Sequence, residues 1–196
     1  MRTQGMQSYS QSMRKHRRAA IKFAILILAL LATTKPNAQD TPAQESAPDV
    51  PDAISVPSGL NPVLSVRAKG DQIYTCQADA GGKFNWTLKG PDAELKDRKD
   101  KVVGQHSAGP KWTLKDGSEI TGKAAAHVDS VDSDSVPWLL LNVTNNSGKG
   151  QLAKVTYVQR VHTHGGQPPA EGCDEAHKSA EMKSSYTADY FFYAPK

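Results

Sequence analysis

Apolar and polar residues alternate at every second position in much of the chain after residue 57, and the alternation stops after short runs. The stops coincide with Gly, Pro, Asn and Asp, the residues that favour turns. An alternation of period two puts one face of an extended chain against a core, so it predicts β-strands rather than helices. The expected strands cover residues 63–68, 72–77, 83–89, 111–115, 119–123, 137–143, 153–162 and 186–193.

Many short strands with turns between them are typical of an all-β fold, here a single antiparallel β-sandwich or barrel-like domain. The run "WLLLNV" at 138–143 has no polar face, which predicts a central strand covered on both sides. Only residues 173–183 could form a helix, and it would be short. The region 57–196, about 140 residues long, has the size of one domain with its own core.

The run "KWTLKDGSEI" at 111–120 predicts a hairpin and its register. A three-residue loop at 115–117 pairs Trp112 with Ile120 and leaves Leu114 on the same side of the hairpin. A two-residue Asp-Gly turn would instead divide this apolar set between two faces. We therefore expect the three-residue loop, with Trp112 buried.

The N-terminus has the features of a secretory signal. Basic residues but no acidic residue precede Asp40, and the apolar run "FAILILALLA" spans residues 23–32. This length fits the core of a signal peptide, roughly 7 to 15 residues, and is shorter than the roughly 20 that cross a membrane. We expect a signal peptide at 1–38, cleaved after Ala38, and a secreted or periplasmic protein. An uncleaved membrane anchor is the alternative, because Pro36 stands where a small residue is preferred.

A linker is expected between the signal and the domain. The segment 35–57 holds five prolines and no aromatic residue. Such a composition cannot bury enough apolar surface to offset the entropy lost on ordering. We therefore predict that residues 39–56 form a Pro-rich disordered linker.

The charge of the chain is concentrated in the leader. Seven of the 24 basic residues precede Ala38, so the remainder carries 17 basic and 20 acidic residues, a net charge of about −3. A nucleic-acid-binding protein needs a basic face, whereas the charged run at 94–101 alternates in sign. The sequence therefore predicts no nucleic-acid partner, and no stable membrane span once the signal is cleaved.

Several motifs follow one another through the domain: "PSGLNPVL", "QIYTC", "VGQHSAGPKW", "VPWLLL", "VTYVQRVHTHGGQPP" and "YTADYFFY". In this order they resemble a family of exported proteins described as domain of unknown function 3455. The resemblance covers residues 57–193 and implies a secreted or envelope-facing protein, of a kind found in bacteria and fungi, with no established activity. No catalytic residue can be carried over from it. It directs attention to His106, Gly109, Pro110, Trp112, Cys76 and Cys173.

The chain has two cysteines, Cys76 and Cys173. In an exported protein two cysteines most simply form one disulfide, which here would close a loop of about 97 residues. A reactive thiol is the alternative, and it would need a basic neighbourhood and a free sulfur atom. We expect the disulfide, and with it a structural rather than a chemical role.

Three histidines are the best candidates for a ligand or metal site. On an extended strand His162 and His164 project from the same face, roughly 6.5 to 7 Å apart, near enough to share a metal ion. Zinc takes three or four protein ligands, so His106 or an acid such as Asp174 would have to complete the site. We expect His106 to be exposed in the Gly-bracketed stretch "GQHSAGP". Exposed histidines without a metal are the simpler interpretation of all three.

Two functions remain open. The favoured one is an exported, non-catalytic β-sandwich that binds an envelope, matrix or small-molecule ligand and needs no cofactor. Trp86 and Tyr190 are candidates for an exposed aromatic platform. The alternative is an enzyme that uses a divalent metal held by His106, His162 and His164. Binding is preferred because no complete catalytic set can be assembled from the sequence.

Overall fold

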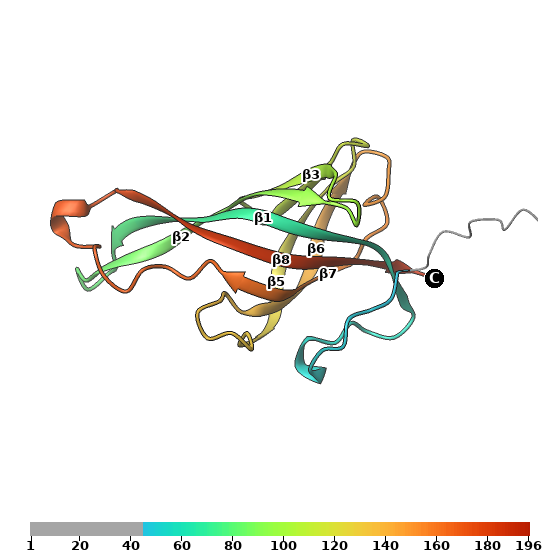
Figure 1. Ribbon diagram of the computed structural model, residues 1–196, viewed down its shortest axis with the longest axis horizontal. Helices are drawn as coiled ribbons and strands as arrows, with labels where there is room; N and C mark the ends of the chain where they lie inside the picture. The colour runs from blue at the N-terminus through green and yellow to red at the C-terminus, as the bar shows by residue number, and fades with distance from the viewer. Residues whose placement is uncertain (1–44) are drawn as a thin grey trace, which may run out of the picture. The chain divides into compact units, whose positions relative to one another are not determined.

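The structure is a computed structural model that describes residues 45–196; the predicted signal peptide and the start of the linker lie outside these residues. Eight strands follow in chain order: β1 (Leu60–Ala78), β2 (Phe84–Lys96), β3 (Val102–Ser107), β4 (Lys111–Leu114), β5 (Glu119–Val128), β6 (Trp138–Ser147), β7 (Tyr157–Gly165) and β8 (Glu181–Pro195). Each strand pairs antiparallel with the next, and β8 pairs with β1, so the sheet closes in a ring (Figure 1). The prediction of one all-β antiparallel domain is confirmed.

The ring is uneven because its strands differ in length. Strand β1 has 19 residues and β8 has 15, whereas β4 has only four. The long strands β1, β2 and β8 run together past the others, toward the left of Figure 1, and form an extension of the ring. The result is one closed sheet with an extension, rather than two separate sheets packed face to face.

Strand β1 joins two of the predicted strands through Gly70. A side chain at Gly70 would meet the backbone of the neighbouring strand, since a Cβ atom there would lie 2.3 Å from the Asp92 carbonyl oxygen. A glycine inside a strand marks such a close approach of two backbones. The chain therefore continues through residues 69–71, which the alternation pattern had left between two strands.

Two other predictions need correction. The stretch 102–107 was not among the expected strands, yet it forms β3 between β2 and β4. The expected helix at 173–183 reduces to the single turn of 3₁₀ helix η2 (Glu175–His177), and the chain then enters β8 at Glu181. Pairing with β1 holds that part of the segment in extended form.

The hairpin between β4 and β5 has the predicted register. Trp112 pairs with Ile120, and Gly117 adopts the left-handed conformation, with φ at 85°. Trp112, Leu114 and Ile120 are all buried on one face. The three-residue loop is therefore confirmed.

The inward faces of the strands pack together inside the ring. On β8, Tyr186, Ala188, Tyr190 and Phe192 alternate with outward residues and are buried. Trp112 on β4 meets two of them edge-on, with ring centroids 5.6 Å from Tyr190 and 6.1 Å from Phe192. Because β4 lies opposite β8 in the ring, Trp112 ties the two sides together.

Residues 50–56 cover part of the outer face of the ring. They include the 3₁₀ helix η1 (Asp52–Ile54), whose Ile54 is fully buried against Leu140 of β6 and Val161 of β7. The side-chain amide of Gln159 donates a hydrogen bond to the Ile54 carbonyl oxygen at 2.8 Å. The covering segment and the outer face of these strands therefore form a second, smaller apolar core.

The packing of residues 50–56 corrects the prediction of a disordered linker and confirms the predicted two-sided burial of β6. The linker was expected to be disordered through residue 56, but residues 50–56 pack on the domain because Val50, Ile54 and Val56 supply apolar contacts. Strand β6 faces the interior with Leu141 and the covering segment with Leu140. It is thus covered on both sides, as the run "WLLLNV" predicts.

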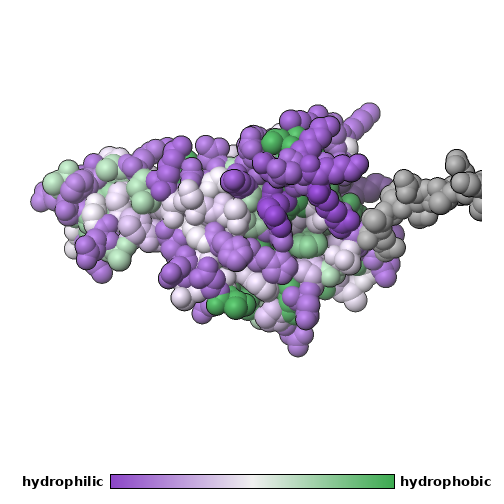
Figure 2. Space-filling view, in the orientation of Figure 1, coloured by the Kyte–Doolittle hydropathy of each residue, from purple (hydrophilic) through white to green (hydrophobic). Residues whose placement is uncertain are grey.

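The surface in Figure 2 is mostly hydrophilic, with small separate hydrophobic areas. Only three large apolar residues in the described part of the chain are exposed: Val63, Leu88 and Val131. Among residues 45–196, no helix is long and apolar enough to span a membrane.

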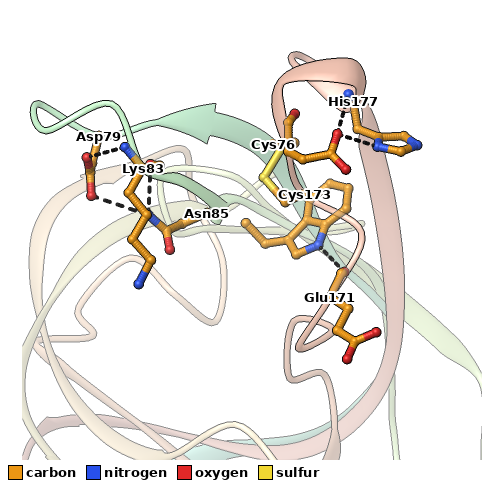
Figure 3. The surroundings of a disulfide bond; sticks show 9 residues. Cys76, Asp79, Lys83, Asn85, Glu171, Cys173 and His177 are labelled. Atoms are coloured by element: carbon orange, nitrogen blue, oxygen red, sulfur yellow. Dashed lines mark hydrogen bonds and ion pairs between the residues drawn. A yellow bond between two sulfur atoms is a disulfide. The ribbon is translucent and has the colours of Figure 1, made fainter.

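A disulfide joins Cys76 of β1 to Cys173 in the extension, and the predicted pairing is confirmed (Figure 3). Two backbone hydrogen bonds also join Cys76 to the segment just before β8. The Cys76 N–H donates to the Ala180 carbonyl oxygen and the Ser179 N–H donates to the Cys76 carbonyl oxygen, both at 2.9 Å. Disulfides form and persist in oxidising compartments. The bond therefore indicates an extracytoplasmic location.

Candidate binding cavity

A cavity of about 340 Å³ lies on the inner side of the ring. Its apolar wall comes from β2, β5 and β6, and its polar or aromatic residues come from β1, β2, β3, β4, β7 and β8. The apolar side chains are Leu88, Ala124, Leu139 and Leu141, and the polar or aromatic ones are Gln72, Lys89, His106, Trp112, Arg160 and Tyr190. Residues far apart in the sequence thus meet only because the sheet closes.

His106 and Trp112 form a flat aromatic pair at the cavity wall. They face each other across β3 and β4, and their rings are parallel within 8° with centroids 4.5 Å apart. The Tyr190 ring stands edge-on to His106 at 5.0 Å. The three rings pack on one another and are almost fully buried, so they form a rigid floor beneath the cavity.

His106 is 2% exposed, which corrects the prediction that it stands in an exposed loop. In β3 the inward positions are Gly104 and His106, and Gln105 between them faces outward. The His106 Nδ1 atom lies 2.8 Å from the Lys111 carbonyl oxygen. A carbonyl can only accept, so Nδ1 carries the proton and Nε2 is left as an acceptor.

Burial lowers the pKa of His106 to about 4, with the charge of Arg160 acting in the same direction and the bond to the Lys111 carbonyl opposing them. The imidazole is therefore neutral at neutral pH. A neutral histidine offers an acceptor to the cavity rather than a positive charge.

Other buried polar atoms around the cavity have no hydrogen-bond partner among residues 45–196. These are both amide atoms of Gln72 and the indole nitrogen of Trp112, together with the hydroxyls of Tyr190 and its neighbour Tyr186. The two hydroxyls are close enough to influence each other's pKa, and burial raises both pKa values. Buried polar groups are normally paired, so this set is unusual, and its atoms lie beneath the accessible surface of the cavity.

Arg160 brings a positive charge to the cavity. Its Nε and Nη2 atoms donate to the Pro137 carbonyl oxygen at 3.1 and 2.8 Å, which fixes the guanidinium beside Tyr190. Within the described residues it has no carboxylate within 4.0 Å, unlike Arg67 and Arg98, which both form ion pairs. Among the described residues that line the cavity, none is acidic.

The structure does not bring the three candidate histidines together. His106 faces the interior, whereas the side chains of His162 and His164 are 48% and 73% exposed on the outside. His162 Nδ1 lies 3.0 Å from Asp189, and His164 Nδ1 lies 3.8 Å from Asp132. The strand bulges there, since His162 has a φ of 49°. In the described part of the chain, no group of three or more His, Cys, Asp or Glu is placed to hold a metal ion.

The proposed aromatic platform also does not form. Tyr190 is 1% exposed and belongs to the interior. Trp86 is partly buried on the extension, where its indole N–H donates to the Glu171 carbonyl oxygen at 3.0 Å, near the disulfide. The two rings therefore serve different parts of the fold.

Gln72 and Arg160 are site residues that sequence reasoning missed. Each stands at an inward position of its strand, Gln72 alternating with Tyr74 and Arg160 with Val158. A polar residue at a core position is an informative signal, because buried polar groups need partners. The signal could be recognised only after the inward face of each strand was known.

The pH dependence of stability should reveal the buried state of His106. Its pKa is about 4 in the folded protein and about 6.5 when unfolded, so the unfolded chain binds more protons between these values. We expect the free energy of unfolding to fall by about 3 kcal/mol from pH 7 to pH 4 through this group. Urea unfolding at several pH values measures it.

The variant His106→Asn keeps a donor for the Lys111 carbonyl but cannot titrate, so its stability should vary less over this range. His127→Asn, on the exposed side of β5, is the matched control and should behave as the wild type. Equal pH slopes for His106→Asn and the wild type would contradict the assignment.

Searches of curated proteins and of solved structures found no match to this chain. The model of the family described as "Protein of unknown function (DUF3455)" matches residues 57–194, as the order of motifs predicts, and the protein therefore belongs to this family.

Proposed function

We propose that this is an exported, non-catalytic binding protein whose ligand is a small molecule held in the cavity inside the ring. The observation that carries the proposal is a cavity whose wall combines accessible apolar side chains, those of Leu88, Ala124 and Leu139, with the guanidinium of Arg160. Small-molecule sites are typically apolar pockets with a few polar or charged groups.

The size of the cavity favours a small molecule over an envelope or matrix polymer. A closed sheet of eight strands has an interior that either fills with side chains or holds one small ligand. A volume of about 340 Å³ is at the lower end of the range for small-molecule sites, roughly 300 to 1,000 Å³. Leu88, which is 52% exposed, lines the site and leaves an apolar entrance.

The chemistry of the wall favours binding over catalysis. Nucleophilic catalysis needs an activated nucleophile, and the described residues that line the cavity include no Ser, Thr, Cys, Asp or Glu. Lys89 is paired with Glu181, and burial raises the pKa of Tyr190, so neither is activated as a nucleophile. The Nδ1 proton of His106 is held by a backbone carbonyl rather than by an acid. Export is supported by the disulfide, which requires an oxidising compartment.

Blocking the cavity tests the function. Ala124 lines the cavity and is itself exposed, so Ala124→Trp should fill the entrance without disturbing the core. We expect the neutral fluorescent dye prodan to bind the wild type with a saturable blue shift of its emission. Ala124→Trp should weaken this binding at least about 10-fold, since a filled cavity cannot bury the dye.

The control is Ala125→Trp, the neighbouring exposed position at the bulge of β5, which does not line the cavity. It adds the same side chain and should leave dye binding unchanged. The proposal fails if the wild type shows no saturable shift, or if Ala124→Trp binds prodan as well as Ala125→Trp does.

A further inference from the structure

The charged residues of the cavity wall indicate the chemical class of the ligand. Arg160 and Lys89 are the charged residues of the wall, and Lys89 is already paired with Glu181 at the surface. Arg160 is left as the cation without a carboxylate partner in the described chain. Arg160 is partly buried, and a partly desolvated charge is stabilised by an opposite charge or by several hydrogen bonds.

Hydrogen bonds fix the position of the Arg160 guanidinium. Two of its N–H groups bind the Pro137 carbonyl oxygen, and the Tyr190 hydroxyl lies beside the same rigid, planar group, which has five N–H groups in all. Its position on β7 between Leu139 and Tyr190 directs it to the cavity rather than to bulk solvent. An arginine fixed in this way suits a carboxylate, which accepts two parallel N–H bonds.

The remainder of the wall defines the body of the ligand. The accessible apolar side chains of the wall are Leu88, Ala124 and Leu139. They suit an apolar group attached to the carboxylate. The buried rings of His106 and Trp112 lie beneath this surface and support it.

We infer that the cavity binds a small organic acid whose carboxylate pairs with Arg160 and whose apolar body lies against Leu88, Ala124 and Leu139. This inference rests on the proposed function of the cavity and adds the chemical class of the ligand. It predicts selection between molecules of the same shape by their charge.

The test uses 2-naphthoate and 2-naphthamide, which share one ring system and differ in charge. Calorimetric titration of the folded protein should show that 2-naphthoate binds roughly 10- to 100-fold more tightly than 2-naphthamide. This is the range expected for one charge-assisted hydrogen bond. Arg160→Met should remove this preference, and Arg160→Lys, which keeps the charge, should retain part of it. Arg67→Met removes an equal charge from the outer surface and should change nothing.

The outcomes separate the two proposals. Equal affinity of the wild type for acid and amide, or binding of prodan without binding of 2-naphthoate, would overturn the inference and leave the cavity function standing. Absence of binding for all three probes would overturn both. If Arg160→Met does not fold, as its melting temperature will show, Arg160→Lys and the acid-to-amide ratio of the wild type still decide the inference.

Discussion

Replacing Trp112 by alanine is expected to lower the free energy of unfolding by about 3 to 5 kcal/mol, as large-to-small changes in a core do. Trp112 is fully buried and packs against His106, Tyr190 and Phe192, so its removal leaves a hole between β4 and β8. The hairpin that carries it is short, and little else on β4 can fill the space. Urea unfolding followed by far-ultraviolet circular dichroism measures the loss.

Trp86→Ala is the matched control, because it deletes the same side chain from a partly buried place on the extension. Its cost should be clearly smaller than that of Trp112→Ala, since fewer neighbours lose contact. A loss below about 1 kcal/mol for Trp112→Ala, the usual effect of a surface change, would show that Trp112 does not hold the ring together.

Local sequence rules predicted those parts of this fold that depend on neighbouring residues. The β4–β5 hairpin follows from turn chemistry and parity alone, because only one loop length puts Trp112, Leu114 and Ile120 on one face. The two-sided burial of β6 follows from a run without a polar face. In both cases the pattern is complete within about ten residues.

Pairing between strands far apart in the sequence determined the strands and the burial that the local pattern did not predict. Gly70 and Gly104 were taken as breaks, whereas they lie inside strands at points where the adjacent backbone leaves no room for a side chain. The exposure of His106 was therefore misjudged, because β3 exists only through its pairing with β2 and β4. The β-propensity of a segment does not reveal which strands will pair with it, so it could not predict the burial of His106.

The candidate site was predicted least well, for a physical reason. In "YTADYFFY" apolar residues occupy both parities near the C-terminal end, so the alternation cannot say whether Tyr190 or Phe191 points inward. The cavity depends on eight strands closing, and its polar or aromatic residues come from six of them. His106 was identified as a candidate, but its partners Gln72 and Arg160 become visible only in the closed ring.

Loss of the disulfide should have the second large effect. Replacing both Cys76 and Cys173 by alanine is expected to lower the free energy of unfolding by about 2 to 5 kcal/mol. The bond joins positions 97 residues apart, so it removes much of the freedom of the unfolded chain. Urea unfolding of the oxidised wild type and of the double variant, at one pH, measures the difference.

The location of the disulfide also predicts where its loss is felt first. The backbone bonds of Cys76 with Ser179 and Ala180 lie beside it on the extension, away from the core of the ring. Hydrogen exchange should therefore show faster exchange of these amides in the double variant, while amides of β5 and β6 change only with global stability. Adding a reductant to the double variant should change nothing. If the wild type reacts with a thiol reagent before reduction, or if reduction leaves its stability unchanged, the bond does not hold the extension to the ring.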